Sequence, residues 1–189
     1  MLYANWRDNV VKIMMDVVIT LLLSLVMPWW LGLLVAHTIN YCINGQAICV
    51  FYHIRAGNLT AQQFYDGTVE MKERLERCKY LDAAISYGSL STGKWHPSSD
   101  IDIRFIPKAG EWNYWMAMLW SVGERTRAFF KGYPLDMYVF TMKHSYDVMS
   151  KKETPIIFKD VNKESAKYYK DVMSFDEFCK MFIQMHLIK

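Results

Sequence analysis

The sequence predicts an α/β fold, in which helices pack on a small mixed β-sheet and an apolar helical hairpin precedes them. Residues 100–105 alternate strictly between polar and apolar side chains, as a strand with one buried face does. Residues 111–131 form a long segment of helical character that ends at a glycine. Residues 17–54 contain no Asp, Glu, Lys or Arg. We therefore expect two parts, an apolar hairpin at residues 1–57 and a domain at residues 58–189.

The N-terminal part contains an apolar run, residues 17–36, that has the length of a membrane span, about 20 residues. Pro28 removes a helix hydrogen bond in the middle of this run. Trp29 and Trp30 would lie at the bilayer centre of a single span, although Trp prefers the membrane interface. The chain therefore favours two helices with a break at these residues.

We expect the two helices to cover residues 9–27 and 31–52 and to associate with a membrane, with both ends of the hairpin on the cytoplasmic side. The alternatives are a single membrane-spanning helix and a hairpin buried inside a soluble protein. The second arm contains four polar residues that are costly in lipid unless they are paired: His37, Asn40, Asn44 and Gln46. They would bond between the arms or to an integral-membrane partner protein.

The remaining elements follow from local signals. Thr60 and Gln63 form a capping box that begins an amphipathic helix extending to residue 79. Further strands are predicted at residues 82–87, 134–140 and, more weakly, 156–158, and Ser174 begins a last amphipathic helix.

Candidate chemistry lies at the junctions between these strands. The strand at residues 82–87 ends in Gly88-Ser89, and after a loop the next strand opens with Asp100-Ile-Asp102. Alternation places Asp100 and Asp102 on one face, with Arg104 beyond them. Adjacent carboxylates repel each other unless a cation lies between them, and Mg²⁺ prefers such oxygen ligands. A glycine permits close approach of the backbone to a phosphate group.

This pattern resembles the minimal nucleotidyltransferases of the polymerase-β superfamily over residues 60–160. The resemblance implies the nucleotidyltransferase fold, an NTP substrate and Mg²⁺ or Mn²⁺ as the cofactor. It implies that Asp100, Asp102 and Asp136, the last on the strand at residues 134–140, are the catalytic metal ligands. Gly88 and Ser89 would bind the β- or γ-phosphate. The reaction implied is attack of an acceptor on the α-phosphate with loss of pyrophosphate.

The chain departs from the family where many relatives carry an arginine soon after the Gly-Ser pair. Lys94 could supply that charge, or Arg104 could hold the triphosphate. Arg104 could equally form a structural ion pair with Asp136. Arg125 and Arg127 lie on the helix at residues 111–131; one of them could point at the nucleotide, but we expect both to face solvent.

Composition limits the partners. A net charge of +3, from 22 basic and 19 acidic residues, does not indicate a specific nucleic-acid-binding surface. The four cysteines have neither metal-ligand nor disulfide-scaffold spacing. The sequence thus favours a membrane-associated nucleotidyltransferase with a cytoplasmic catalytic domain and an unidentified hydroxyl or phosphate acceptor. The alternatives are a catalytically weak nucleotide-binding membrane subunit that docks a partner enzyme, and an antitoxin that modifies a partner protein.

Overall fold

The computed structural model describes residues 6–44, 59–149 and 153–186, and within them it contains a five-stranded mixed sheet. The strands follow the order β3-β2-β1-β4-β5, where β1 pairs antiparallel with both β2 and β4. The pairs β2–β3 and β4–β5 are parallel. The bounds are β1 (Leu81–Tyr87), β2 (Ile101–Pro107), β3 (Leu135–Val139), β4 (Ile156–Asp160) and β5 (Met173–Ser174). The prediction of an α/β fold with a small mixed sheet is confirmed.

Helices cover the two faces of the sheet unequally. The larger core lies under α4 (Ala61–Arg77), α5 (Glu111–Lys131) and α7 (Phe175–His186). Alternate residues of β2 point into it, namely Ile101, Ile103 and Phe105. A smaller cluster lies on the other face, under α6 (Met142–Val148) and near the 3₁₀ helix η1 (Glu164–Lys167). Polar residues of β2 and β3 therefore fall on the less covered face.

Local signals in the chain explain several element ends. Thr60 accepts a hydrogen bond from the Gln63 amide and the Gln63 side chain bonds back to Thr60, so the predicted capping box begins α4. Gly132 takes a left-handed conformation, with φ 62°, and ends α5 at the predicted residue. The elements α6, η1 and β5 were not predicted, because each is short and carries little periodicity.

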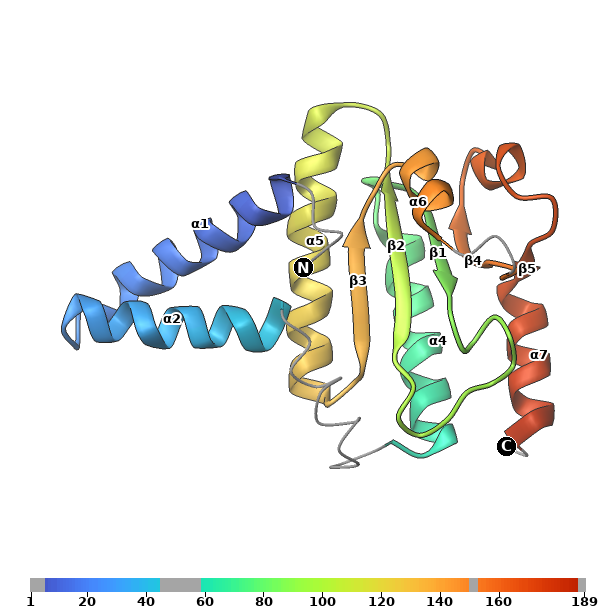
Figure 1. Cartoon of the computed structure of the whole chain (residues 1–189), viewed down its shortest axis with the longest axis horizontal. Helices are drawn as coiled ribbons and strands as arrows, with labels where there is room; N and C mark the ends of the chain where they lie inside the picture. The colour runs from blue at the N-terminus through green and yellow to red at the C-terminus, as the bar shows by residue number, and fades with distance from the viewer. Residues whose placement is uncertain (1–5, 45–58, 150–152, 187–189) are drawn as a thin grey trace.

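Two N-terminal helices, α1 (Trp6–Leu23) and α2 (Trp29–Asn44), pack side by side and extend away from α5 (Figure 1). The break between them falls at the predicted place, because Pro28 immediately precedes α2, and its carbonyl accepts hydrogen bonds from the amides of Leu31 and Gly32. The first helix begins three residues and ends four residues earlier than predicted, and residues 45–52 of the second predicted helix, with Gln46, lie outside the described residues. No helix in the described ranges is long and apolar enough to cross a membrane.

Polar groups of α2 bond to α1. The Asn40 amide donates to the Lys12 carbonyl at 2.7 Å and to the Asp16 carboxylate at 2.8 Å. His37 Nδ1 lies 3.1 Å from the other Asp16 oxygen, and the Asn44 amide donates to Met15 Sδ of α1 at 3.5 Å. Of the two uses predicted for these polar residues, the structure has the bonds between the arms.

Candidate active site

Two of the predicted carboxylates are direct neighbours in the sheet. In the parallel pair β2–β3, Asp102 lies opposite Asp136. Both side chains are on the face that α4 and α5 do not cover, since Ile101 and Ile103 point into the core beneath those helices. Asp100 immediately precedes β2, and its negative charge also raises the pKa of Asp136. The three predicted carboxylates thus act on one another.

Asp136 is the most perturbed of these groups. Burial, followed by the negative charge of Asp102, raises the pKa of the Asp136 carboxyl from 3.8 to about 8. Arg104 opposes this shift, whereas a hydrogen bond with Asp102 and the charge of Asp100 add to it. Asp136 Oδ1 is buried and has no hydrogen-bond partner among the described residues. An acceptor oxygen in this position is available to a cation or to a proton donor on a substrate.

Arg104 is held inside the protein by Asp102. Its Nη2 donates to Asp102 Oδ1 at 3.2 Å, and the guanidinium lies over the rings of Tyr138 and Phe140, 5.0 and 5.9 Å from their centroids. Only 7% of Arg104 is exposed. The predicted structural ion pair therefore exists with Asp102 in place of Asp136, although the positive charge still favours ionisation of Asp136.

The loop after β1 brings Gly88 against the carboxylates. Gly88 has φ 83°, and a Cβ atom at this position would lie 3.1 Å from Asp102 Oδ2. Only glycine combines this backbone conformation with so close an approach. Ser89 follows it and is half-buried, and its carbonyl accepts a hydrogen bond from the Lys94 amide at 2.9 Å. Lys94 itself is exposed, and among the described residues its ammonium group has no carboxylate within 4.0 Å.

The Gly88 amide already has a hydrogen-bond acceptor, a carboxylate that the sequence did not predict at this position. Glu153, in the segment before β4, accepts a hydrogen bond from the Gly88 N–H through Oε2 at 2.9 Å. A carboxylate oxygen here is an anionic acceptor of the same kind as a phosphate oxygen. No pattern in the sequence indicates this contact, because Gly88 and Glu153 are separated by 65 residues.

Arg125 is a second missed residue, and the expectation that it faces solvent is wrong. It is 5% exposed, and its Nη2 donates to Asp8 Oδ1 of α1 at 3.4 Å and to Ser121 Oγ at 3.2 Å. Burial lowers its pKa, and the negative charges of Asp8 and Asp136 oppose that effect. Arg125 thus places a positive charge between the base of the hairpin and the carboxylate strand.

Helical spacing could have revealed Arg125. It lies on the same face of α5 as Ala117, Ser121 and Ala128, which are all buried, at spacings of three or four residues. Arg127 lies off this face, and 48% of its side chain is exposed as predicted.

The carboxylate oxygens are suitable ligands for a divalent cation, but they are not arranged as a complete set of ligands. Within the described ranges, no three or more Asp, Glu, His or Cys side chains are grouped so that they could hold a metal ion. The pair Asp102 and Asp136 nevertheless offers oxygen donors only, and the buried Asp136 Oδ1 has no partner among the described residues. Mg²⁺ and Mn²⁺ favour such donors and take the rest of their ligands from water and phosphate.

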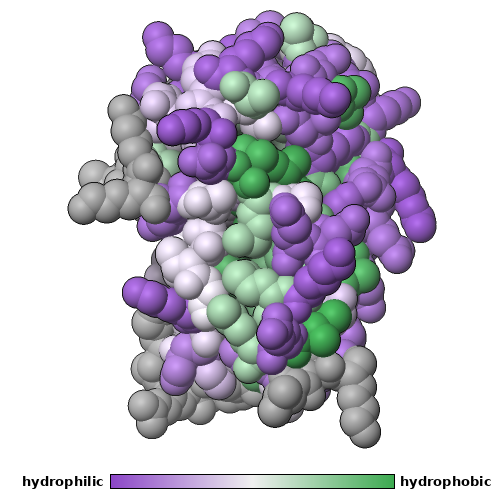
Figure 2. All heavy atoms as spheres, turned by 90° about the vertical axis from the view of Figure 1, so that its right-hand side faces the viewer, coloured by the Kyte–Doolittle hydropathy of each residue, from purple (hydrophilic) through white to green (hydrophobic). Residues whose placement is uncertain are grey.

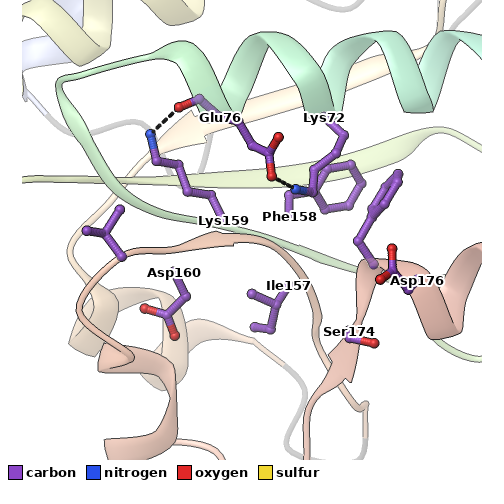
Figure 3. A pocket seen from close by; sticks show the side chains of 10 residues that line it. Lys72, Glu76, Ile157, Phe158, Lys159, Asp160, Ser174 and Asp176 are labelled. Atoms are coloured by element: carbon purple, nitrogen blue, oxygen red, sulfur yellow. Dashed lines mark hydrogen bonds and ion pairs between the residues drawn. The ribbon is translucent and has the colours of Figure 1, made fainter.

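A hollow of about 540 Å³ lies elsewhere, between the end of α4, β4 and the start of α7 (Figure 3). Lys159 lines it and donates to the carbonyls of Leu75, Glu76 and Cys78 at 3.2, 3.0 and 2.6 Å. This ammonium group therefore caps the C-terminal end of α4. None of the predicted site residues lines this hollow.

No protein-family model, no curated protein and no solved structure matches this chain.

Proposed function

We propose that the chain is a nucleotidyltransferase that moves an NMP from an NTP to a hydroxyl or phosphate group of an acceptor, at a membrane surface. The observation that carries the proposal is the direct juxtaposition of Asp102 and Asp136 beside the Gly88 amide. Neighbouring, partly buried carboxylates are unfavourable for the fold alone, because each raises the free energy of ionising the other. Such pairs occur where a cation or a proton has to be held.

The residues have distinct roles in this reaction. Asp102 and Asp136, with Asp100, would hold Mg²⁺ or Mn²⁺, and the metal would neutralise negative charge on the triphosphate. The Gly88 amide, now bonded to Glu153, would donate to a phosphate oxygen, with Ser89 beside it. Arg104 keeps Asp102 oriented through its ion pair.

The acceptor oxygen attacks the α-phosphorus, and the bond from that phosphorus to the bridging oxygen of the leaving pyrophosphate breaks. Where the acceptor is a hydroxyl, its proton passes to the Asp136 carboxylate. The raised pKa of Asp136, about 8, belongs to the metal-free protein, and a bound cation would lower it and keep the carboxylate ionised to accept this proton.

The test measures pyrophosphate release and binding of ATP, GTP, CTP and UTP with Mg²⁺ or Mn²⁺. Asp102→Asn should abolish transfer and weaken binding of the metal–NTP complex. Asp136→Asn should reduce transfer more than binding. Asp82→Asn is the matched control, since Asp82 is a buried aspartate on β1 that accepts a hydrogen bond from Asn162 at 2.6 Å. Full transfer by Asp102→Asn, or no binding of any metal–NTP complex by the parent, would refute the enzymatic proposal.

A second candidate function is a nucleotide-binding subunit that docks a membrane enzyme. The contact between Glu153 and the Gly88 amide favours it, because a carboxylate already takes the position proposed for phosphate. Binding of NTP without pyrophosphate release, both in the parent and in Glu153→Gln, would select this function over the first.

A further inference from the structure

The surface of the N-terminal hairpin, formed by α1 and α2, is the largest feature that the proposed chemistry does not use. Its exposed apolar residues recur along both helices at spacings of i, i+1, i+4 and i+5. They are Ile13, Met14, Val17, Val18, Leu21, Leu22, Leu25, Val26, Trp29, Trp30, Leu33 and Leu34. Leu25 and Val26, at the turn, are 81% and 80% exposed. Half of the circumference of each helix is therefore apolar and uncovered.

The interior of the hairpin has the opposite character. Small residues make the contact between the helices: Ala36 is fully buried, and a Cβ on Gly32 would lie 3.3 Å from Leu23 Cβ. Asn40, which is 5% exposed, turns inward to bond to α1. Large apolar groups outside, with small and polar groups between the helices, are typical of helix pairs that pack in lipid.

Charge is distributed along the hairpin in the same way. The charged residues of α1, Arg7, Asp8, Lys12 and Asp16, all lie within its first 11 of 18 residues, and α2 contains no Asp, Glu, Lys or Arg within its described length. The last charged residue, Asp16, is paired with His37, whose side chain is 71% exposed. Between this pair and the turn, the surface of the hairpin has no ionisable group. Such a surface suits the hydrocarbon interior of a bilayer, which does not solvate charges.

The length of the hairpin between the Asp16–His37 pair and the turn is comparable to the hydrocarbon thickness of one leaflet. Residues 17–23 of α1 rise about 10 Å, and residues 29–36 of α2 rise about 12 Å. The hydrocarbon core of one leaflet is about 15 Å thick. The uncharged helical parts therefore span about two thirds to four fifths of one leaflet, and the turn at residues 24–28 lies beyond them.

We propose that this hairpin inserts its turn end into the acyl chains of one leaflet, with Asp16 and His37 at the level of the headgroups. This places Trp29 and Trp30 among the acyl chains, deeper than the interface that Trp prefers, and the depth measurement below tests that placement. The inference deepens the membrane location in the proposed function and does not depend on the chemistry of the carboxylates. Lipid covers every apolar side of the two helices at once. A second copy of the chain, packed on one side, would leave the opposite apolar side in water.

The test uses the full chain, transferred from detergent into vesicles of phosphatidylcholine and phosphatidylglycerol and separated by flotation. The parent should float with the vesicles. Val26→Asp should lower the bound fraction about tenfold or more, because a charge in the hydrocarbon region is costly. Val161→Asp is the matched control, as Val161 is 56% exposed and lies after β4, far from the hairpin. Figure 2 shows that the face of the molecule opposite the hairpin carries many hydrophilic side chains, which flank a narrower strip of apolar ones.

Depth is measured by quenching of Trp fluorescence with brominated lipids, as the difference between the parent and Trp29→Phe/Trp30→Phe. Quenching by bromine near the ends of the acyl chains supports insertion. Quenching only by bromine near the headgroups would refute insertion and show a hairpin that lies flat on the surface. Insertion would also be refuted if the parent did not float but formed a dimer that Val26→Asp dissociates.

Binding of metal–NTP in detergent should be equal for the parent, Val26→Asp and Val161→Asp. A failure of vesicle binding with nucleotide binding retained overturns only the lipid inference. The reverse result overturns only the proposed chemistry.

Discussion

Replacing Asp136 with Asn should stabilise the metal-free protein, and the gain should grow as the pH rises. The pKa of Asp136 is about 8 in the folded protein, whereas an aspartate in the unfolded chain has its ordinary pKa of 3.8. Between these values the unfolded chain releases a proton that the native state retains, so the free energy of unfolding falls with increasing pH. The asparagine side chain has a similar shape and does not ionise, and it therefore removes this pH dependence.

The size of the effect follows from the shift. Each pH unit between the two pKa values changes the free energy of unfolding by about 1.4 kcal/mol. Over the roughly four units between them the upper limit is about 5 kcal/mol. Asp102 ionises in the same cluster and shares part of the charge, so we expect a gain of about 2–4 kcal/mol at pH 8 and about zero at pH 4.

Urea denaturation of the parent, Asp136→Asn and Asp82→Asn at pH 4, 6 and 8, with EDTA present, measures these differences. Adding Mg²⁺ at pH 8 should then stabilise the parent more than Asp136→Asn, because the cation binds the ionised carboxylate. A stability difference between the parent and Asp136→Asn that is the same at all three pH values would refute the reasoning. So would an equal gain in Asp82→Asn.

Three further substitutions test other parts of the structure. Gly88→Ala should lower the free energy of unfolding by about 1–2 kcal/mol and weaken NTP binding, because φ is 83° and the new Cβ would press on Asp102. Denaturation and nucleotide titration measure the two effects. Asp8→Ala should cost about 3 kcal/mol, since it leaves the buried Arg125 without its carboxylate; an unchanged urea midpoint would contradict the burial of that pair. Thr60→Ala should cost about 1 kcal/mol in thermal unfolding through the lost cap of α4, whereas Thr60→Ser should retain it.

The strands and helices that carry the site could be predicted from the sequence because their signals are local. The alternation of residues 100–105 indicates which face of β2 carries the carboxylates, and the chain keeps this pattern in the structure. Glu111 and Gly132 mark the two ends of α5. The break before α2 could be predicted as well, since proline restricts the backbone in any tertiary context.

The partners of the site residues depended on the tertiary structure. The sequence left Arg104 between a phosphate and Asp136, and the fold pairs it with Asp102. Arg125 was expected in solvent but is buried, and the carboxylate of Asp8, on the distant hairpin, makes the largest contribution that offsets the cost of burying its charge. Whether a charged residue can be buried depends on its contacts with other elements, and the helix propensity of a sequence carries no information about those contacts.

The sequence by itself determined that the chain folds as α/β, that Asp100 and Asp102 open a strand after a loop that begins at Gly88, and that an uncharged helical segment precedes them. Only the tertiary structure decided that Asp102 lies directly opposite Asp136 and that Glu153 bonds to the Gly88 amide. The physical reason is that a period of two or 3.6 residues specifies the direction of a side chain. Its neighbour across the sheet depends on strand register, which is set by long-range packing of the whole core.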